Sequence, residues 1–189
     1  MKTFKNLSSR RIVVTTGLCL SSGILSAILF DSFEDSQIAI FTLPSILFGL
    51  SIVISNFKVF GNKIQRALTT ILLCTICWMT LLPLSSLFIL LPFHPLVGLS
   101  IIGFIYAIVV LLIFSIFMKF SNLLETAGIV GVAGITAFVI FYFITDRKTG
   151  AAENLEYLFV LWQTLVGFAI SLGFKRTASA NQTHEQSFG

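Results

Sequence analysis

Long runs of apolar residues, separated by short polar stretches, dominate the chain. Six such runs cover approximately residues 12–30, 37–57, 67–91, 95–118, 123–145 and 155–174. Each run is close to the roughly 20 helical residues that cross a hydrocarbon core of about 30 Å. Apolar and polar residues do not alternate within the runs, as they would in the strands of a membrane barrel. Because a helix satisfies its own backbone hydrogen bonds in lipid, the pattern predicts six membrane-spanning helices.

The composition agrees with this interpretation. Of the 189 residues, 56% are hydrophobic and only 11% are charged, whereas soluble domains have about 25% charged residues. We therefore expect one all-α, polytopic transmembrane helical bundle over residues 1–176, with a disordered cytoplasmic tail at 177–189.

Basic residues precede the first run, as in a signal peptide. The run exceeds the roughly 7–15 apolar residues of a signal core and lacks a small-x-small cleavage site, which predicts a retained span.

The basic residues are unevenly distributed between the two sides of a six-span chain. Only Arg147 and Lys148 fall opposite the N-terminal side. The N-terminal side receives Lys2, Lys5, Arg10, Arg11, Lys58, Lys63, Arg66, Lys119, Lys175 and Arg176. The positive-inside rule then predicts that both termini are cytoplasmic (N-in/C-in). The small size and short loops favour a bacterial plasma (inner) membrane, and the dispersed basic residues predict no nucleic-acid partner.

The predicted bundle centre has almost no charge, which argues against ion-coupled transport. A possible ligand layer there consists of Ser22, Thr80, Tyr106, Thr136, Trp162 and Gln163. The side-chain amide of Gln163 needs a hydrogen-bond partner in lipid, and Tyr106 lies at a matching depth in the fourth run. We interpret these polar groups chiefly as bonds between helices. The alternative is a pocket for a small neutral or amphipathic ligand.

Small residues recur at the spacing that allows helices to pack closely. The predicted packing positions are Gly23, Ala27, Gly103, Ala107, Gly128, Gly131, Gly134 and Gly167. Residues of this kind let helix backbones approach one another and gain dispersion energy. Because it has the most of them, the fifth run is expected to form the most buried helix or an oligomer contact.

Cys74 and Cys77 have the CxxC spacing of redox and metal sites. A reactive pair of this kind needs a helix N-terminus or a nearby cation to form the thiolate, and this pair lies within an apolar run. Cys19 is predicted at the same depth as Cys74, so the three thiols could cluster if the first and third helices pack together. We interpret all three cysteines as small packing residues, and the cluster remains the alternative.

Several polar residues and prolines are explained by the structure of the predicted helices and need no functional role. Asn122 and Glu125 have the spacing of an N-terminal capping box for the fifth helix. Glu156 lies in the first turn of the sixth helix, where the helix dipole favours an acid. Pro44 and Pro83 are expected to kink or break the second and third helices.

The outer loops contain a possible cation site. Asp31, Glu34, Asp35 and His94 supply the carboxylates and imidazole that suit divalent metals. Solvation of the loops is the simpler interpretation of these residues, and we expect no metal site or cofactor.

The chain contains no recognisable catalytic motif, and we expect a non-enzymatic membrane protein. Its partners are expected to be the lipid bilayer and either another membrane protein or further copies of this chain. A role as a subunit of a larger membrane assembly is our first hypothesis. A small-solute transport or binding module that uses a neutral polar pocket is the alternative.

Overall fold

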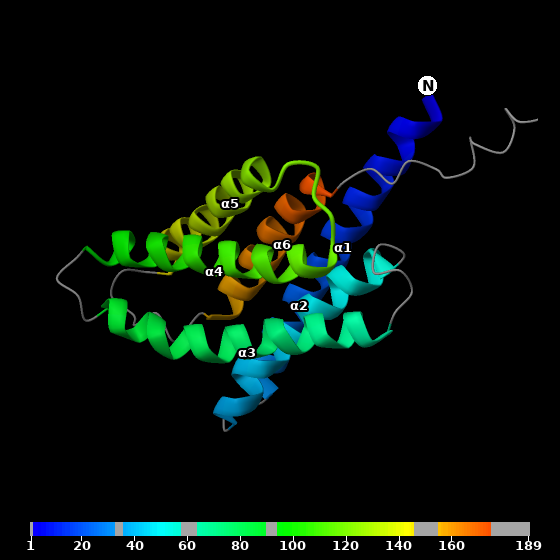
Figure 1. Cartoon of the computed structure of the whole chain (residues 1–189). Coiled ribbons are helices and arrows are strands. Elements are labelled where there is room, and N and C mark those ends of the chain that lie inside the picture. Colours follow the sequence, from blue (N-terminus) through cyan, green and yellow to red (C-terminus); the bar gives the residue numbers. More distant parts are fainter. Residues whose placement is uncertain (1, 33–35, 58–63, 90–93, 146–154, 175–189) are drawn as a thin grey trace, which may run out of the picture.

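The computed structural model of the protein describes residues 2–32, 36–57, 64–89, 94–145 and 155–174. The helices are α1 (Lys2–Ser32), α2 (Gln37–Ser55), α3 (Ile64–Ile89), α4 (Pro95–Phe117), α5 (Leu123–Ile144) and α6 (Leu155–Gly173) (Figure 1). The described residues contain no strand, and an isolated bridge joins Phe120 to Phe174. The prediction of an all-helical protein is therefore confirmed.

Four helical segments are long and apolar enough to cross a membrane. They are Ser9–Phe30, Pro95–Phe117, Leu123–Ile144 and Glu156–Gly173. Two shorter apolar segments, Thr42–Ser55 and Ile64–Thr80, lie in α2 and α3. These helices fit a membrane protein. The helix boundaries agree closely with the six apolar runs except at the start of α1, where the helix begins at Lys2 rather than near residue 12.

The helices form a closed ring in chain order. Each helix contacts the next one along the chain, and α1 contacts α6, which closes the ring. In Figure 1, α6 lies between α5 and α1. Of the four long apolar helices, α6 is the most buried. The expectation that the fifth helix is the most buried is therefore wrong, because α6 contacts α1, α2 and α5, whereas α5 contacts mainly α4 and α6.

Glycines bring neighbouring helices into backbone contact at two places. A Cβ added at Gly103 of α4 would lie 2.5 Å from the carbonyl oxygen of Gly134 of α5. A Cβ added at Gly23 of α1 would lie 2.7 Å from the Cα of Val160 of α6. No side chain fits at either crossing, so these glycines set the distance between the helices.

The other predicted packing residues occupy different environments. Gly131 faces the ring of Phe104, and Gly167 faces Cys19. Ala107 is buried, and Ala27 is half-buried. Gly128 is exposed, with no atom within 4 Å of an added Cβ. Every glycine of this set except Gly128 therefore faces another helix of the bundle.

Asn122 caps the N-terminus of α5, as the sequence predicts. Its Oδ1 accepts a hydrogen bond from the backbone N–H of Glu125 at 3.3 Å, and its Nδ2 donates to Glu125 Oε2 at 3.4 Å. The cap satisfies one of the backbone donors that lack an intrahelical partner at a helix start. The Asn122–Glu125 side-chain bond also holds the carboxylate near the positive end of the helix dipole.

Replacing Asn122 by alanine is expected to lower the free energy of unfolding by about 1 kcal/mol, because one helix amide loses its acceptor. Thermal unfolding of the purified protein in detergent measures this loss. Ser121→Ala is not a suitable control because Ser121 bonds to another helix, whereas Asn122→Ser keeps a capping oxygen and should retain most of the stability. Equal losses for Asn122→Ala and Asn122→Ser would contradict the capping role.

The carboxyl end of α6 is held by two other segments. Ser121 donates its backbone N–H and its hydroxyl to the carbonyl oxygen of Gly173, at 2.9 Å and 3.2 Å. Arg11 of α1 donates Nη2 to the carbonyl oxygen of Phe174 at 3.3 Å, and its guanidinium lies 5.2 Å from the centre of the Phe174 ring. Donors and a cation at this position satisfy carbonyls that have no intrahelical partner. The start of α1 and the α4–α5 connection therefore meet at the same end of the bundle.

The two prolines do not break their helices. α2 continues through Pro44, and α3 continues past Pro83 as far as Ile89. Other predictions concern residues outside the described ranges, namely Glu34, Asp35, Lys58, Lys63, Arg147, Lys148, Lys175, Arg176 and the tail at 177–189.

Candidate functional site

A buried glutamine joins three helices halfway along α6. The Oε1 atom of Gln163 accepts a hydrogen bond from Ser22 Oγ of α1 at 2.6 Å. Its Nε2 atom donates to Ser26 Oγ of α1 at 3.3 Å and to the carbonyl oxygen of Pro44 of α2 at 3.0 Å. The side chains of Ser22, Ser26 and Gln163 are buried. The side-chain amide therefore links α6 to both α1 and α2.

The two serines suit this role because of their spacing. Residues four apart lie on the same face of a helix, so Ser22 and Ser26 both face α6. The hydroxyl of Ser26 also donates to the backbone carbonyl of Ser22 at 2.8 Å. The oxygen and the nitrogen of the Gln163 amide thus both have partners, and such satisfied networks fix the arrangement of the helices around them.

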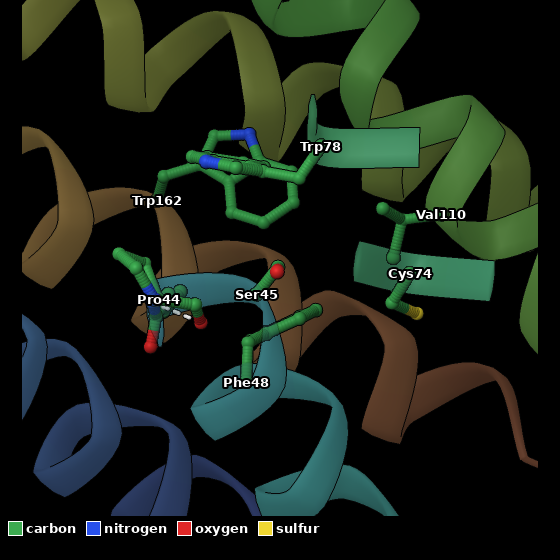
Figure 2. Close-up of a pocket in the computed structure, with 8 residues that line it drawn as sticks. Pro44, Ser45, Phe48, Cys74, Trp78, Val110 and Trp162 are labelled. Atoms are coloured by element: carbon green, nitrogen blue, oxygen red, sulfur yellow. Dashed lines mark hydrogen bonds between the residues drawn. The ribbon is translucent and has the colours of Figure 1, made fainter. Parts of the chain in front are cut away.

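An aromatic cluster lies beside this polar network. The ring of Trp162 lies 5.1 Å from that of Trp78 and 5.3 Å from that of Phe48, measured between centroids. Trp78 in turn lies 5.3 Å from Tyr106 in an edge-on arrangement and 6.1 Å from Phe159. Figure 2 shows the indole rings of Trp78 and Trp162 side by side. Rings at these distances attract one another beyond the gain from burial, so the cluster binds α2, α3, α4 and α6 together.

A small cavity separates the polar network from the aromatic cluster. Its volume is about 10 Å³, and its lining is Pro44, Ser45, Phe48, Cys74, Trp78, Val110, Trp162 and Gln163 (Figure 2). One water needs about 10–15 Å³ on this measure, whereas pockets for drug-sized ligands measure about 300–1,000 Å³. In this conformation the cavity is large enough for about one water and too small for a solute of several heavy atoms.

The two indole groups beside the cavity have hydrogen-bond donors that are unsatisfied within the described part of the chain. The Nε1 atoms of Trp78 and Trp162 are buried and have no acceptor among the described residues. A buried donor without a partner is uncommon and destabilising. These two donors are the feature of the layer that best fits binding of a polar group.

Comparison with known proteins adds no functional assignment. No protein-family model matches the chain, and neither a curated protein nor a solved structure matches it. The function must therefore be inferred from the chemistry and geometry of the chain itself.

Four of the six predicted ligand-layer residues lie in one buried region. Ser22, Trp162 and Gln163 belong to the polar network and cavity, and Tyr106 is joined to them through Trp78. The partner of Gln163 differs from the one expected, because the amide bonds to Ser22, Ser26 and Pro44, whereas Tyr106 packs against Trp78.

Thr80 and Thr136 lie away from this region. The hydroxyl of Thr80 donates to the carbonyl of Ile76 at 2.9 Å, and that of Thr136 donates to the carbonyl of Val132 at 2.8 Å. Neither residue lines the cavity. Position along an apolar run indicates the depth of a residue but not the face of the helix on which it lies, and both threonines bond to their own helices.

The structure does not bring the three cysteines together. Cys19 of α1 packs against Gly167 of α6, and the main neighbours of α1 are α2 and α6 rather than α3. Cys74 lines the cavity, and Cys77 is buried in the same helix. Among the described residues, no group of three or more His, Cys, Asp or Glu side chains is placed to hold a metal ion.

His94 has a structural partner at the start of α4. Its Nδ1 accepts a hydrogen bond from the backbone N–H of Leu96 at 3.3 Å, and its ring lies 6.2 Å from that of Tyr142. The imidazole therefore caps a helix and packs on an aromatic ring. Glu34 and Asp35, which the predicted cation site also requires, lie outside the described residues.

Several residues of the site were not predicted from the sequence. The missed residues are Ser26, Ser45, Phe48, Trp78 and Val110. The spacing of Ser26 from Ser22 was a usable signal, because residues four apart share a helix face. The acceptor role of the Pro44 carbonyl has no signal in the sequence, because it depends on how α2 and α6 are placed.

Proposed function

We propose that this chain is a non-enzymatic integral membrane protein with six spans that serves as a subunit of a larger membrane assembly. In this proposal both termini are cytoplasmic, and the plasma membrane of a bacterium suits its small size and short loops. Its role is to present a rigid surface to a partner membrane protein within the bilayer. The open face of α5 around Gly128 is the observation on which this proposal depends.

The filled interior favours a binding surface over an internal site. Among the described residues no Asp, Glu, Lys, Arg or His side chain is buried. The cavity at Gln163 has a volume of only about 10 Å³. Proton relays and ion pathways use ionisable groups inside the bundle, so these observations direct attention to the outer surface.

The outer face of α5 has the geometry of a helix-packing site. Gly128 is exposed, with nothing within 4 Å of an added Cβ. One turn to either side lie Leu124, which is 84% exposed, and Val132, which is 62% exposed. A glycine between two protruding apolar side chains lets a partner helix approach closely, as small-residue contacts do in membranes. The other glycines of α5, Gly131 and Gly134, already face α4.

The arrangement of basic residues supports the proposed orientation. Arg11 meets the carboxyl end of α6, and Arg66 and Lys119 line one hollow at the adjoining ends of α3 and α4. These residues come from parts of the chain that a six-span topology places on one side. Clustering of cations at one end is what the positive-inside rule requires of a cytoplasmic face.

The test is co-purification of the full chain from its native membrane in mild detergent. Wild-type protein should retain a stoichiometric membrane partner, and Gly128→Leu should lose it, because the leucine fills the contact. Gly17→Leu on α1 is the matched control, since Gly17 is equally open and exposed, and it should retain the partner. Neither variant should unfold at a lower temperature than the wild-type chain separated from its partner. Recovery of a lone wild-type monomer, or equal loss in both variants, would contradict the proposal.

A second candidate function is binding or transport of a small neutral solute at the Gln163 layer. The partnerless indole donors of Trp78 and Trp162 beside the cavity favour it. The cavity is lined by residues of α2, α3, α4 and α6, so binding of a solute there would require some of these helices to move apart. The Gln163 variant described in the Discussion distinguishes this function from a purely structural layer.

A further inference from the structure

A second hollow lies between the start of α3 and the end of α4. Its volume is about 450 Å³, and it is lined by Arg66, Ser115, Ile116, Phe117, Met118 and Lys119. Arg66 lies in the first turn of α3, and Lys119 lies just beyond Phe117, the last residue of α4. In the proposed topology, both cations therefore flank apolar helices at the level where the membrane meets water.

The hollow has a net positive charge. Arg66 and Lys119 are exposed, and none of the residues that line the hollow is acidic. The amide end of α3 contributes about half a positive charge, and the carbonyl end of α4 about half a negative charge. These two contributions cancel, so the two side-chain cations determine the charge that the hollow attracts.

The wall beside the cations is apolar. Ile116 lines the hollow and is 64% exposed. Leu112 lies one turn earlier on the same face of α4 and is also exposed. A ligand that places an anion between Arg66 and Lys119 can therefore lay a hydrocarbon chain along Ile116 and Leu112. Free phosphate would gain nothing from this apolar wall.

We propose that this hollow binds an anionic phospholipid, with its phosphate between Arg66 and Lys119 and an acyl chain along α4. Basic pockets between membrane helices are suited to anionic lipid headgroups. The inference rests on the membrane placement proposed above but not on the partner at Gly128. It gives Arg66 and Lys119 a role beyond orientation, since a bound lipid would join the ends of α3 and α4.

The experiment uses the full chain, delipidated in a mild neutral detergent. Phosphatidylglycerol, phosphatidylcholine and inorganic phosphate are added separately, and lipid binding is followed by native mass spectrometry and by the unfolding temperature. Arg66→Gln, Lys119→Gln and the double variant remove the cations without changing the side-chain size greatly. Arg10→Gln is the matched control, because Arg10 is an exposed cation on α1 that does not line the hollow.

Wild-type protein should bind and be stabilised by phosphatidylglycerol in preference to phosphatidylcholine. Each single variant should weaken this binding roughly fivefold, as expected for removing one cation near an anionic lipid, and the double variant more strongly. Arg10→Gln should bind as the wild type does. Equal weakening by Arg10→Gln, equal binding of phosphatidylcholine, or equal stabilisation by inorganic phosphate would each overturn the inference.

Membrane fractionation and partner co-purification of the wild-type chain, done before delipidation, separate failure of this inference from failure of the proposed function. Protein that stays in the membrane fraction and keeps its partner but shows no preference for phosphatidylglycerol overturns the lipid site alone. Protein that is recovered from the aqueous fraction without detergent overturns the membrane placement, and with it both proposals.

Discussion

Replacing Gly134 by alanine is expected to destabilise the protein by about 1–3 kcal/mol, the usual penalty for overpacking a well-packed contact. An added Cβ at Gly134 would collide with the carbonyl oxygen of Gly103 and lie 2.6 Å from Ala107 Cβ. The first of these atoms belongs to the backbone and cannot rotate away. α4 and α5 would have to move apart, and the packing between them would be lost along their length.

Gly128→Ala is the matched control for this prediction when both variants are measured on the chain separated from any partner, because it makes the same substitution six residues earlier on the same helix. Nothing lies within 4 Å of a Cβ at Gly128. Alanine is favoured over glycine in a helix interior by about 0.5–1 kcal/mol, so this variant should be as stable as the wild type or slightly more so. Gly134→Ala should therefore lower the free energy of unfolding, whereas Gly128→Ala should not.

Thermal unfolding in detergent, followed by helical circular dichroism, measures both variants. Gly134→Val should be worse than Gly134→Ala, since a branched side chain needs more space at the same crossing. If Gly134→Ala proves as stable as Gly128→Ala, the close approach of α4 and α5 at Gly103 and Gly134 is incorrect.

The helices were predictable from the sequence because lipid imposes a simple condition on the backbone. Apolar segments of about 20 residues in a bilayer form helices that satisfy their own hydrogen bonds. α4, observed over Pro95–Phe117, accordingly matches the run predicted at 95–118. The start of α1 was less predictable, because residues 2–11 are mostly polar and lie outside the apolar run.

The contacts between helices were less predictable than the helices themselves. A helix that is apolar on all sides gives little indication of the side that faces its neighbours. The sequence therefore placed Thr80 and Trp162 at the same level, although Trp162 is buried and Thr80 exposed. It also could not distinguish Gly128, which faces outwards, from Gly134, which faces α4.

The polar network shows the same limit at the candidate site. Gln163 was recognisable as a buried amide that needs a partner, because an unsatisfied amide in lipid is destabilising. Its partners depend on which helices adjoin α6, and the ring closed by α1 and α6 supplies Ser22 and Ser26. Chemistry indicated the need for hydrogen bonds, whereas the packing order of the helices determined the groups that provide them.

Replacing Gln163 by leucine is expected to lower the free energy of unfolding by about 1–4 kcal/mol. The variant loses the bonds to Ser22, Ser26 and the Pro44 carbonyl, each worth roughly 0.6–2 kcal/mol within a membrane bundle. The expected loss of stability is smaller than the sum of three such bonds, because Ser26 keeps its hydrogen bond to the Ser22 carbonyl in the variant. Thr164→Val is the matched control on α6, since among the described residues the Thr164 hydroxyl bonds only to the carbonyl of Val160 in its own helix. This variant should change the free energy of unfolding by less than about 0.5 kcal/mol.

A double-mutant cycle with Ser22→Ala isolates the contact between α1 and α6. Residues in one hydrogen-bond network show coupling of about 0.5–3 kcal/mol, whereas independent residues are additive. We expect Ser22→Ala and Gln163→Leu to be coupled in this range, and additive losses would contradict the 2.6 Å bond between the Ser22 and Gln163 side chains.

The same variants also distinguish the two candidate functions. If a small neutral solute raises the unfolding temperature of the wild type and of Thr164→Val but not of Gln163→Leu, the layer binds a ligand. If no solute does so while the coupling is present, the amide of Gln163 serves to hold α1, α2 and α6 together.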